Sequence, residues 1–374
     1  MPVTTIASRA RHRIEAACSA GLDAQELLDT VADELCPAIG ADGLFLAATD
    51  PETLLGLGAG LVQGIPDTVC APFWEYEFEV PDYNKFTDLA TGPQPVADLH
   101  AATGGRPQRS ARWRELKRLM DADAELRAAF TANGRAWGVM HASRSGGSGG
   151  FGADAVALVE GLAPLIARGL RRALISQPAC GPLNRGPGIA TFDPDGRLLS
   201  ATAEAVAWFD ELVSIRPLPD PSGITVPGEV LIAAQEARAR AGDPDGPARA
   251  TRTRARTGSG AWLLIHASCL RCPAGTLGPT AVVIEPAKAS EVAPLIVEAY
   301  GLTPREVDVT SALARGLSTN EIAASLHLSR YTVQDHLKAV YEKVGVSTRG
   351  ELVARMFADH YEERLAEAVS ARAA

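Results

Sequence analysis

The chain has 374 residues, which at roughly 150 residues per domain predicts two or three domains, each large enough to bury its own core. Hydrophobic residues make up 46% and charged residues 22%, so the composition excludes a disordered or fibrous chain. The formal net charge of −9 argues against a chain coated in nucleic acid. It leaves room for one small DNA-binding module on an acidic body.

Apolar runs are short throughout the sequence. The run at 261–265 is far below the ~20 residues that span a bilayer, and the basic N-terminus is followed by no apolar segment. Six cysteines are too few for a disulfide scaffold. We therefore expect a cytoplasmic protein with no membrane partner and mostly reduced cysteines.

Two breaks rich in glycine or proline divide the chain. The first covers residues 176–188, and the second falls at Glu285-Pro286. We expect three domains, at residues 1–176, 186–290 and 297–374.

The first region has the pattern of an α+β domain. Helical segments at 5–20 and 24–36 precede an apolar strand at 42–49, and a helix at 154–174 closes the region. Asn133-Gly134 lies between two strand-like runs, which strongly predicts a β-hairpin.

In the segment FWEYEF at 73–78, aromatic and acidic residues alternate from Trp74 onward. This pattern predicts a half-buried strand with Trp74, Tyr76 and Phe78 on one face. Together with Trp137, these three side chains are candidates for the wall of a ligand pocket. Packing in the core is the alternative.

The second region also has an α+β pattern. Two short strands flank Asp195-Gly196, a helix follows at 201–212, and three further strands are expected at 248–257, 261–270 and 280–286. The alternating residues Arg252, Arg254 and Arg256 predict a solvated strand face, with a basic contact to DNA or a partner as the alternative.

The last region carries repeated helix-start signals. Thr303-Pro304-Arg305-Glu306 and Ser318-Thr319-Asn320-Glu321 are capping boxes, Ser329 is a third cap, and Thr348-Arg349-Gly350-Glu351 opens a fourth helix. Two short helices joined by so tight a turn before Ser329 form a helix-turn-helix within an all-α, four-helix module.

The helix after Ser329 is amphipathic. Its apolar stripe consists of Val333, Leu337, Val340 and Val344. The opposite face carries side chains able to bond base edges or phosphates: Tyr331, Gln334, Asp335 and Lys338.

The motifs LTPRE, ARGLSTNEIA, LSRYTVQDHLKAVYEKVGV and TRGELV make this module resemble the C-terminal DNA-binding domain of the LuxR family. The resemblance implies that the helix from Arg330 to Val344 lies in the major groove of double-stranded DNA. It places base-reading positions on Gln334, Asp335 and Lys338. It places backbone-contacting positions on Thr332, His336 and Lys343.

Two features of the module depart from that pattern. The family commonly has lysine at the position of Gln334 and a neutral residue at that of Asp335. Residues 301–357 contain seven Lys or Arg and six Asp or Glu, a net charge of +1. A scaffold that has lost contact with DNA is therefore kept as an alternative.

The regions before the module resemble known sensory domains. Residues 134–174 are similar to the end of a GAF domain and residues 188–209 to the start of a PAS domain. Nothing resembles a phosphorelay receiver domain. The arrangement implies a one-component, sequence-specific transcription regulator that acts as a homodimer, with RNA polymerase and a small-molecule effector as candidate partners.

An enzyme acting in the GAF-like cavity is the rival hypothesis from another class. No P-loop, HExxH motif, zinc signature or convincing pair of nucleophile and base is present in the sequence. We therefore assign no catalytic residue and no metal ligand, and the sequence identifies no cofactor.

Overall fold

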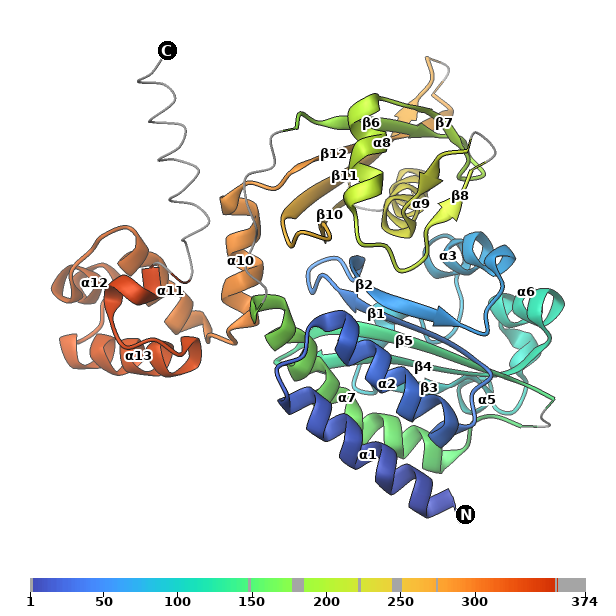
Figure 1. Ribbon diagram of the computed structural model, residues 1–374, viewed down its shortest axis with the longest axis horizontal. Helices are drawn as coiled ribbons and strands as arrows, with labels where there is room; N and C mark the ends of the chain where they lie inside the picture. Colours follow the sequence, from blue (N-terminus) through green and yellow to red (C-terminus); the bar gives the residue numbers. More distant parts are fainter. Residues whose placement is uncertain are drawn as a thin grey trace. The chain divides into compact units, whose positions relative to one another are not determined.

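A computed structural model of the chain describes residues 3–146, 149–176, 185–220, 223–243, 251–273, 275–353 and 355. The chain forms two compact units, Met1–Pro286 and Ala287–Ala374. The first unit contains two five-stranded antiparallel sheets and the second is helical (Figure 1). The break predicted at 176–188 lies partly outside the described residues.

The first sheet belongs to the first domain of this unit. Its strands are β1 (Gly43–Thr49), β2 (Gly56–Gln63), β3 (Val96–Asp98), β4 (Ala122–Ala132) and β5 (Arg135–Ser145), in the order β2-β1-β5-β4-β3. The hairpin predicted at Asn133-Gly134 is confirmed, since it joins β4 to β5 with both residues in left-handed conformations.

Helices cover both faces of the first sheet. On one face lie α1 (Val3–Ser19), α2 (Ala24–Ile39) and α7 (Ala153–Ser176), the three helices that the sequence predicts (Figure 1). Shorter helices fill the segment between β2 and β4: α3 (Cys70–Phe78), α4 (Phe86–Thr91), α5 (Leu99–Ala102) and α6 (Ala111–Met120). Single 3-10 turns precede α3 and α6, at Asp67–Val69 and Pro107–Arg109.

The strand predicted for residues 73–78 is wrong, because this segment forms the end of helix α3. An alternating pattern of six residues also fits a helix, where positions four apart share a face. Trp74 and Phe78 accordingly stack, with ring centroids 5.6 Å apart and planes at 13°. Phe73 and Glu77, also four apart, are both buried.

The second sheet belongs to the second domain of the same unit. Its strands are β6 (Gly188–Phe192), β7 (Leu198–Ala201), β10 (Thr251–Arg256), β11 (Trp262–Arg271) and β12 (Leu277–Pro286), in the order β10-β11-β12-β6-β7. The predicted strands and the helix at 201–212, which is α8 (Ala203–Glu211), are confirmed. The sequence analysis missed α9 (Gly228–Gly242) and the small hairpin of β8 (Leu218–Pro219) and β9 (Thr225–Val226).

One continuous apolar core joins the two domains. It extends from Phe45 and Val139 in the first sheet, through Trp74 on α3 and Ile232 on α9, to Ile284 in the second sheet. Burial of this shared apolar area stabilises the two domains as one unit.

Arg254 also joins the two domains, and it corrects the prediction of a solvated arginine face on β10. Its side chain is 9% exposed and forms ion pairs with Asp50 at 2.8 Å and Glu52 at 2.9 Å. Arg252 is exposed, and Arg256 lies over the ring of Trp262. Only one of the three side chains therefore behaves as predicted.

The helical unit contains α10 (Ala289–Ala299), α11 (Pro304–Ala314), α12 (Thr319–Leu326) and α13 (Arg330–Val344). Residues 349–353 form the start of the predicted fourth helix. Within the described part of the chain, no helix is long and apolar enough to cross a membrane.

Candidate functional sites

The helix starts of the second unit are fixed by the predicted caps. Thr303 accepts a bond from the Glu306 backbone at 3.3 Å, and Glu306 accepts one from the Thr303 backbone at 2.6 Å. Ser318 and Glu321 form the same reciprocal pair before α12. Each box satisfies backbone N–H groups that the first turn leaves free.

The turn between α12 and α13 is as tight as the sequence indicates. His327 ends α12 with φ of 54°, in the left-handed region, and Ser329 begins α13 by accepting a bond from the Thr332 backbone at 3.1 Å. A left-handed residue other than glycine was not foreseen. Histidine is among the residues that adopt this conformation more readily than most.

Helix α13 is amphipathic in the predicted sense. Val333, Leu337, Val340 and Val344 are buried against the rest of the unit. Gln334, Asp335 and Lys338 are exposed, and Tyr331 is 79% exposed. The side chains expected to read bases are thus free to approach a groove.

The three side chains expected to contact the DNA backbone are partly buried or hydrogen-bonded within the unit, unlike those expected to read bases. Thr332 and His336 are half-buried, and the hydroxyl of Thr332 lies 2.8 Å from that of Ser329. Lys343 donates to Glu306 at 2.6 Å and to the carbonyl of Gly301 at 3.3 Å. Although burial acts in the opposite direction, the Lys343 bond keeps the pKa of Glu306 below its usual range.

Internal bonds also engage another cation of the module. Arg349 donates to the carbonyls of Leu313 and Leu317 at 3.0 and 2.9 Å, at the end of α11. Among the described residues of α13, Arg330 and Lys338 are therefore the exposed cations without an ion pair. The unpaired positive charge of this helix therefore lies at its first residue and near its middle.

Comparison with known proteins identifies the module. Residues 301–356 match the family model "Bacterial regulatory proteins, luxR family". These residues are a LuxR-type helix-turn-helix domain, as the sequence resemblance predicts.

Relatives match this chain over short segments. The probable HTH-type transcriptional regulator GfsR of Streptomyces halstedii is 33% identical over 24% of this chain and 38% of its own. The transcriptional regulatory protein UhpA of Escherichia coli is 50% identical over 15% of this chain and 29% of its own. The chain thus covers less than two fifths of either relative.

Among solved structures, VqmA of Vibrio cholerae in complex with ligand and DNA matches at 18% identity. The match covers 46% of this chain and 81% of VqmA, with a TM-score of 0.23. A superposition this loose does not bear on the fold.

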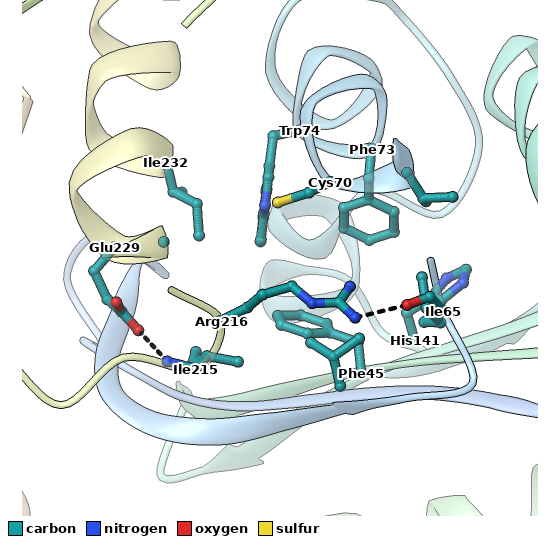
Figure 2. A pocket seen from close by; sticks show the side chains of 13 residues that line it. Phe45, Ile65, Cys70, Phe73, Trp74, His141, Ile215, Arg216, Glu229 and Ile232 are labelled. Atoms are coloured by element: carbon teal, nitrogen blue, oxygen red, sulfur yellow. Dashed lines mark hydrogen bonds between the residues drawn. The ribbon is translucent and has the colours of Figure 1, made fainter. Parts of the chain in front are cut away.

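A cavity lies between the two domains of the first unit (Figure 2). Trp74, one of the predicted pocket residues, lines it, whereas Tyr76, Phe78 and Trp137 are not among its lining residues. Its walls are Phe45, Val62, Ile65, Val69, Cys70, Phe73, Trp74 and His141 from the first domain, and Ile215, Arg216, Gly228, Glu229 and Ile232 from the second.

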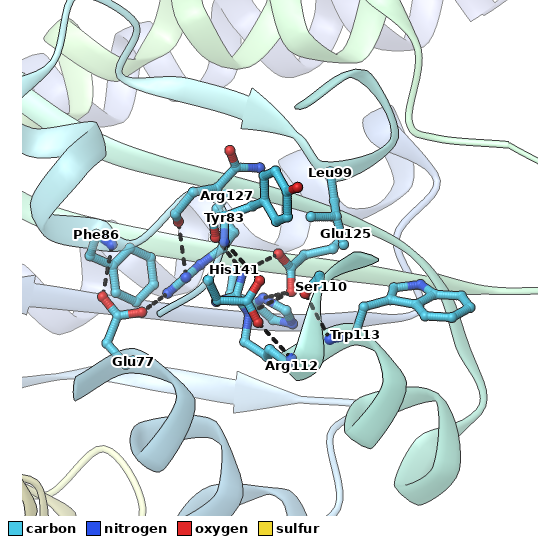
Figure 3. A network of polar contacts seen from close by, with 12 residues as sticks. Glu77, Tyr83, Phe86, Leu99, Ser110, Arg112, Trp113, Glu125, Arg127 and His141 are labelled. Carbon is cyan, nitrogen blue, oxygen red and sulfur yellow. Dashed lines mark hydrogen bonds and ion pairs between the residues drawn. The ribbon is translucent and has the colours of Figure 1, made fainter. Parts of the chain in front are cut away.

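Next to this cavity, the first domain encloses a network of charged side chains (Figure 3). Arg127 pairs with Glu77 at 2.7 Å, and Arg112 pairs with Glu125 at 2.7 Å. His141, also fully buried, lies 3.7 Å from Glu125. The sequence analysis missed this network. Charged residues within an otherwise apolar strand, such as Glu125 and Arg127 on β4, could have indicated it.

Burial and charge set the pKa values in the network. Burial lowers the pKa of His141 to about 3, so the ring is neutral at physiological pH. Against the effect of burial, Arg112 lowers the pKa of Glu125 to about 2. The described residues contain no group of His, Cys, Asp and Glu side chains arranged to hold a metal ion. The network therefore consists of internal ion pairs between buried charges.

Proposed function

We propose that this protein is a sequence-specific, DNA-binding transcription regulator. The observation that carries the proposal is the luxR-family match at residues 301–356, on a module whose helix α13 exposes Gln334, Asp335 and Lys338 opposite a buried stripe. In this proposal α13 enters the major groove and those three side chains contact base edges. The regulatory relatives favour this function over the enzyme and scaffold alternatives.

The first unit is the control region in this proposal. Both five-stranded sheets have the order 2-1-5-4-3 when the strands of each sheet alone are numbered in chain order. Strand order is the feature by which GAF and PAS domains are recognised, so it supports the GAF-like and PAS-like assignments. A small-molecule effector acts on this region, without phosphorelay input.

The protein acts as a homodimer in the cytoplasm, with RNA polymerase as a candidate partner. One helix-turn-helix covers too little DNA surface for tight specific binding, and two-fold sites follow from dimers. Light scattering on the full chain tests this assembly, and a monomer at micromolar concentration both with and without DNA contradicts it.

The test of DNA binding uses the full chain and fragments of its own genome. We expect selected fragments to bind at low salt and to bind less tightly as salt rises. The double variant Gln334→Ala/Lys338→Ala removes exposed side chains from α13 and should abolish selection without changing the thermal melt. Arg305→Ala removes an exposed charge from α11 instead and is the matched control.

Failure to bind any genomic fragment at low salt overturns the proposal. Equal loss of selection in the Arg305→Ala control overturns the role of α13.

Lys338 and Lys343 test how α13 divides its contacts. Lys338→Ala should cost ~1–3 kcal/mol of binding free energy and relax preference at one or two base pairs. Lys343→Ala should weaken binding to all sequences alike and lower the salt dependence by about one unit per half-site. Because Lys343 also pairs with Glu306, its variant should melt earlier as well.

Salt-titrated binding to the selected fragment and to its single-base changes separates the two roles. Val333→Asp places a charge in the core of the module and should unfold it rather than change its preference. A reshaped base preference in Lys343→Ala, with an unchanged one in Lys338→Ala, contradicts this placement of α13.

A further inference from the structure

The cavity between the two domains of the first unit combines aromatic walls with one buried acid. Phe45, Phe73 and Trp74 contact one another edge to face, with ring centroids 5.1 to 6.0 Å apart, and form the wall on the first domain. Figure 2 shows Glu229 and Ile232 of α9 facing them across the cavity. The site is therefore largely apolar and is incomplete without either domain.

One oxygen of the Glu229 carboxylate forms a hydrogen bond within the protein, and, against the effect of burial, the nearby Ser214 side chain and the Glu229 backbone also lower the pKa of this group. The side chain is 1% exposed, and one oxygen, Oε1, accepts a bond from the backbone of Ile215 at 3.0 Å. The other oxygen, Oε2, is buried with no hydrogen-bond partner among the described residues. A buried acceptor without a partner is unfavourable, and native proteins rarely leave one unless a ligand or water fills the role.

The nearby arginine does not neutralise this acid. Arg216 crosses the cavity in Figure 2. Its Nε pairs with Asp67 at 2.9 Å and its Nη2 donates to the carbonyl of Ile65 at 2.7 Å. Both contacts direct the guanidinium toward the first domain. The structure describes no ion pair between Arg216 and Glu229.

We propose that this cavity binds a small, flat, apolar molecule that carries one N–H or O–H donor. The apolar body lies against Phe45, Phe73 and Trp74, and the donor bonds to Glu229 Oε2. This inference rests on the proposed function, since it assigns the effector of the control region to a place and a chemical class. Burial raises the pKa of Glu229, which is consistent with an acid held in an apolar site.

Regulation follows from the position of the cavity. A molecule seated there contacts α3 and β1 of the first domain and α9 of the second, so it binds only while the two domains are held together. Binding therefore stabilises the joined form of the first unit over any separated form.

The test compares two probes of nearly the same shape, indole and benzothiophene. Indole has an N–H donor where benzothiophene has sulfur. We expect both to bind the full chain at one site, with indole about tenfold tighter because one additional buried hydrogen bond forms. Calorimetry and ligand-observed NMR measure the two affinities without using DNA.

Two kinds of variant assign the binding to this cavity. Ile232→Trp fills the space and should abolish binding of both probes, and Ile232→Phe, which adds less volume, is used if the first variant fails to fold. Glu229→Gln keeps an acceptor for Ile215 but presents a donor to the probe, so the preference for indole should vanish. Glu236→Gln makes the same substitution on α9 at a residue that pairs with Arg240 and does not line the cavity, and it is the control.

The outcomes separate this inference from the DNA-binding proposal. Equal affinity of the two probes overturns the role of Glu229, and unchanged binding in both Ile232 variants overturns the location. No saturable binding of either probe at millimolar concentration overturns the site altogether. Because DNA binding is measured separately, its loss alone leaves this inference standing.

Discussion

The two sheets of the first unit share a strand order but differ in how they are buried. In the first sheet, every residue of β1 is buried, and so are eight consecutive residues of β5. In the second sheet, β12 alternates between buried and partly exposed residues, and Ile189 and Leu199 are 47% and 55% exposed. The same topology therefore supports one sheet covered on both faces and one covered on a single face.

This difference has a chemical consequence. A sheet covered on both faces has no solvent to receive its charged side chains, so Glu125 and Arg127 form ion pairs with Arg112 and Glu77 inside the domain. The second sheet places polar side chains such as Ser268 on its open face. The buried charges of the first unit are accordingly concentrated around the first sheet.

The largest expected effect comes from a charge placed in each sheet. Met140→Asp on β5, at a position with no exposure, should leave the first unit unfolded, since the destabilisation exceeds ~4 kcal/mol. Ile189→Asp on the open face of β6 should cost about 1 kcal/mol or less. Circular dichroism melts compare the two, and similar melts in both variants contradict the difference in burial.

The second prediction concerns ion pairs in the two domains. Glu125→Gln leaves Arg112 buried without its counter-charge and should cost ~3–5 kcal/mol. Glu211→Gln breaks a half-exposed pair with Arg185 in the second domain and should cost ~0–1 kcal/mol. Urea denaturation measures both, and a loss below about 1 kcal/mol for Glu125→Gln shows that the network is dispensable.

Local signals account for what the sequence predicted well. The capping boxes at Thr303 and Ser318, and the Asn133-Gly134 turn, act within a few residues, so they determine structure without knowledge of distant partners. The continuous apolar run of β1 and the amphipathic stripe of α13 similarly follow from nearest neighbours.

The errors arose where distant residues decide the structure. Arg254 is buried by acids about 200 positions away in the sequence, so an alternating pattern on its own strand could not predict the outcome. The aromatic period of residues 73–78 was too short to separate a strand from a helix. Of the cavity wall only Trp74 was predicted, for the same reason, because five of its 13 lining residues come from α9 and residues 215–216.

The third prediction uses pH. The pKa of His141 is about 3 in the folded chain and ~6.5 when unfolded. The unfolded state therefore binds the proton first, and stability should fall by ~1.4 kcal/mol per pH unit below ~6.5, or ~2 kcal/mol by pH 5. The raised pKa of Glu229 in the second domain acts with the opposite sign, since the folded state then binds the proton more tightly.

His141→Asn isolates the histidine contribution. The slope of stability between pH 6.5 and 5 should become shallower than in the unsubstituted chain by ~1.4 kcal/mol per unit. His12→Asn, at an exposed position on α1, should leave that slope unchanged. An unchanged slope in His141→Asn shows that the burial of a neutral ring does not govern the acid response.

The smallest expected effect lies in the turns of the two sheets. Asn133 and Gly134 both have positive φ, of 55° and 73°, whereas in the turn of the second sheet only Gly196 does. There, Asp193 fixes the turn by accepting bonds from the backbones of Asp195 and Arg197.

Asn133→Ala should cost about 1 kcal/mol, because alanine adopts the left-handed region less readily. Asp195→Ala keeps its backbone bond and should change stability by less than ~0.5 kcal/mol. Urea midpoints at constant slope measure both, and an equal loss in the two variants indicates that side chains, rather than backbone handedness, determine the cost of these turns.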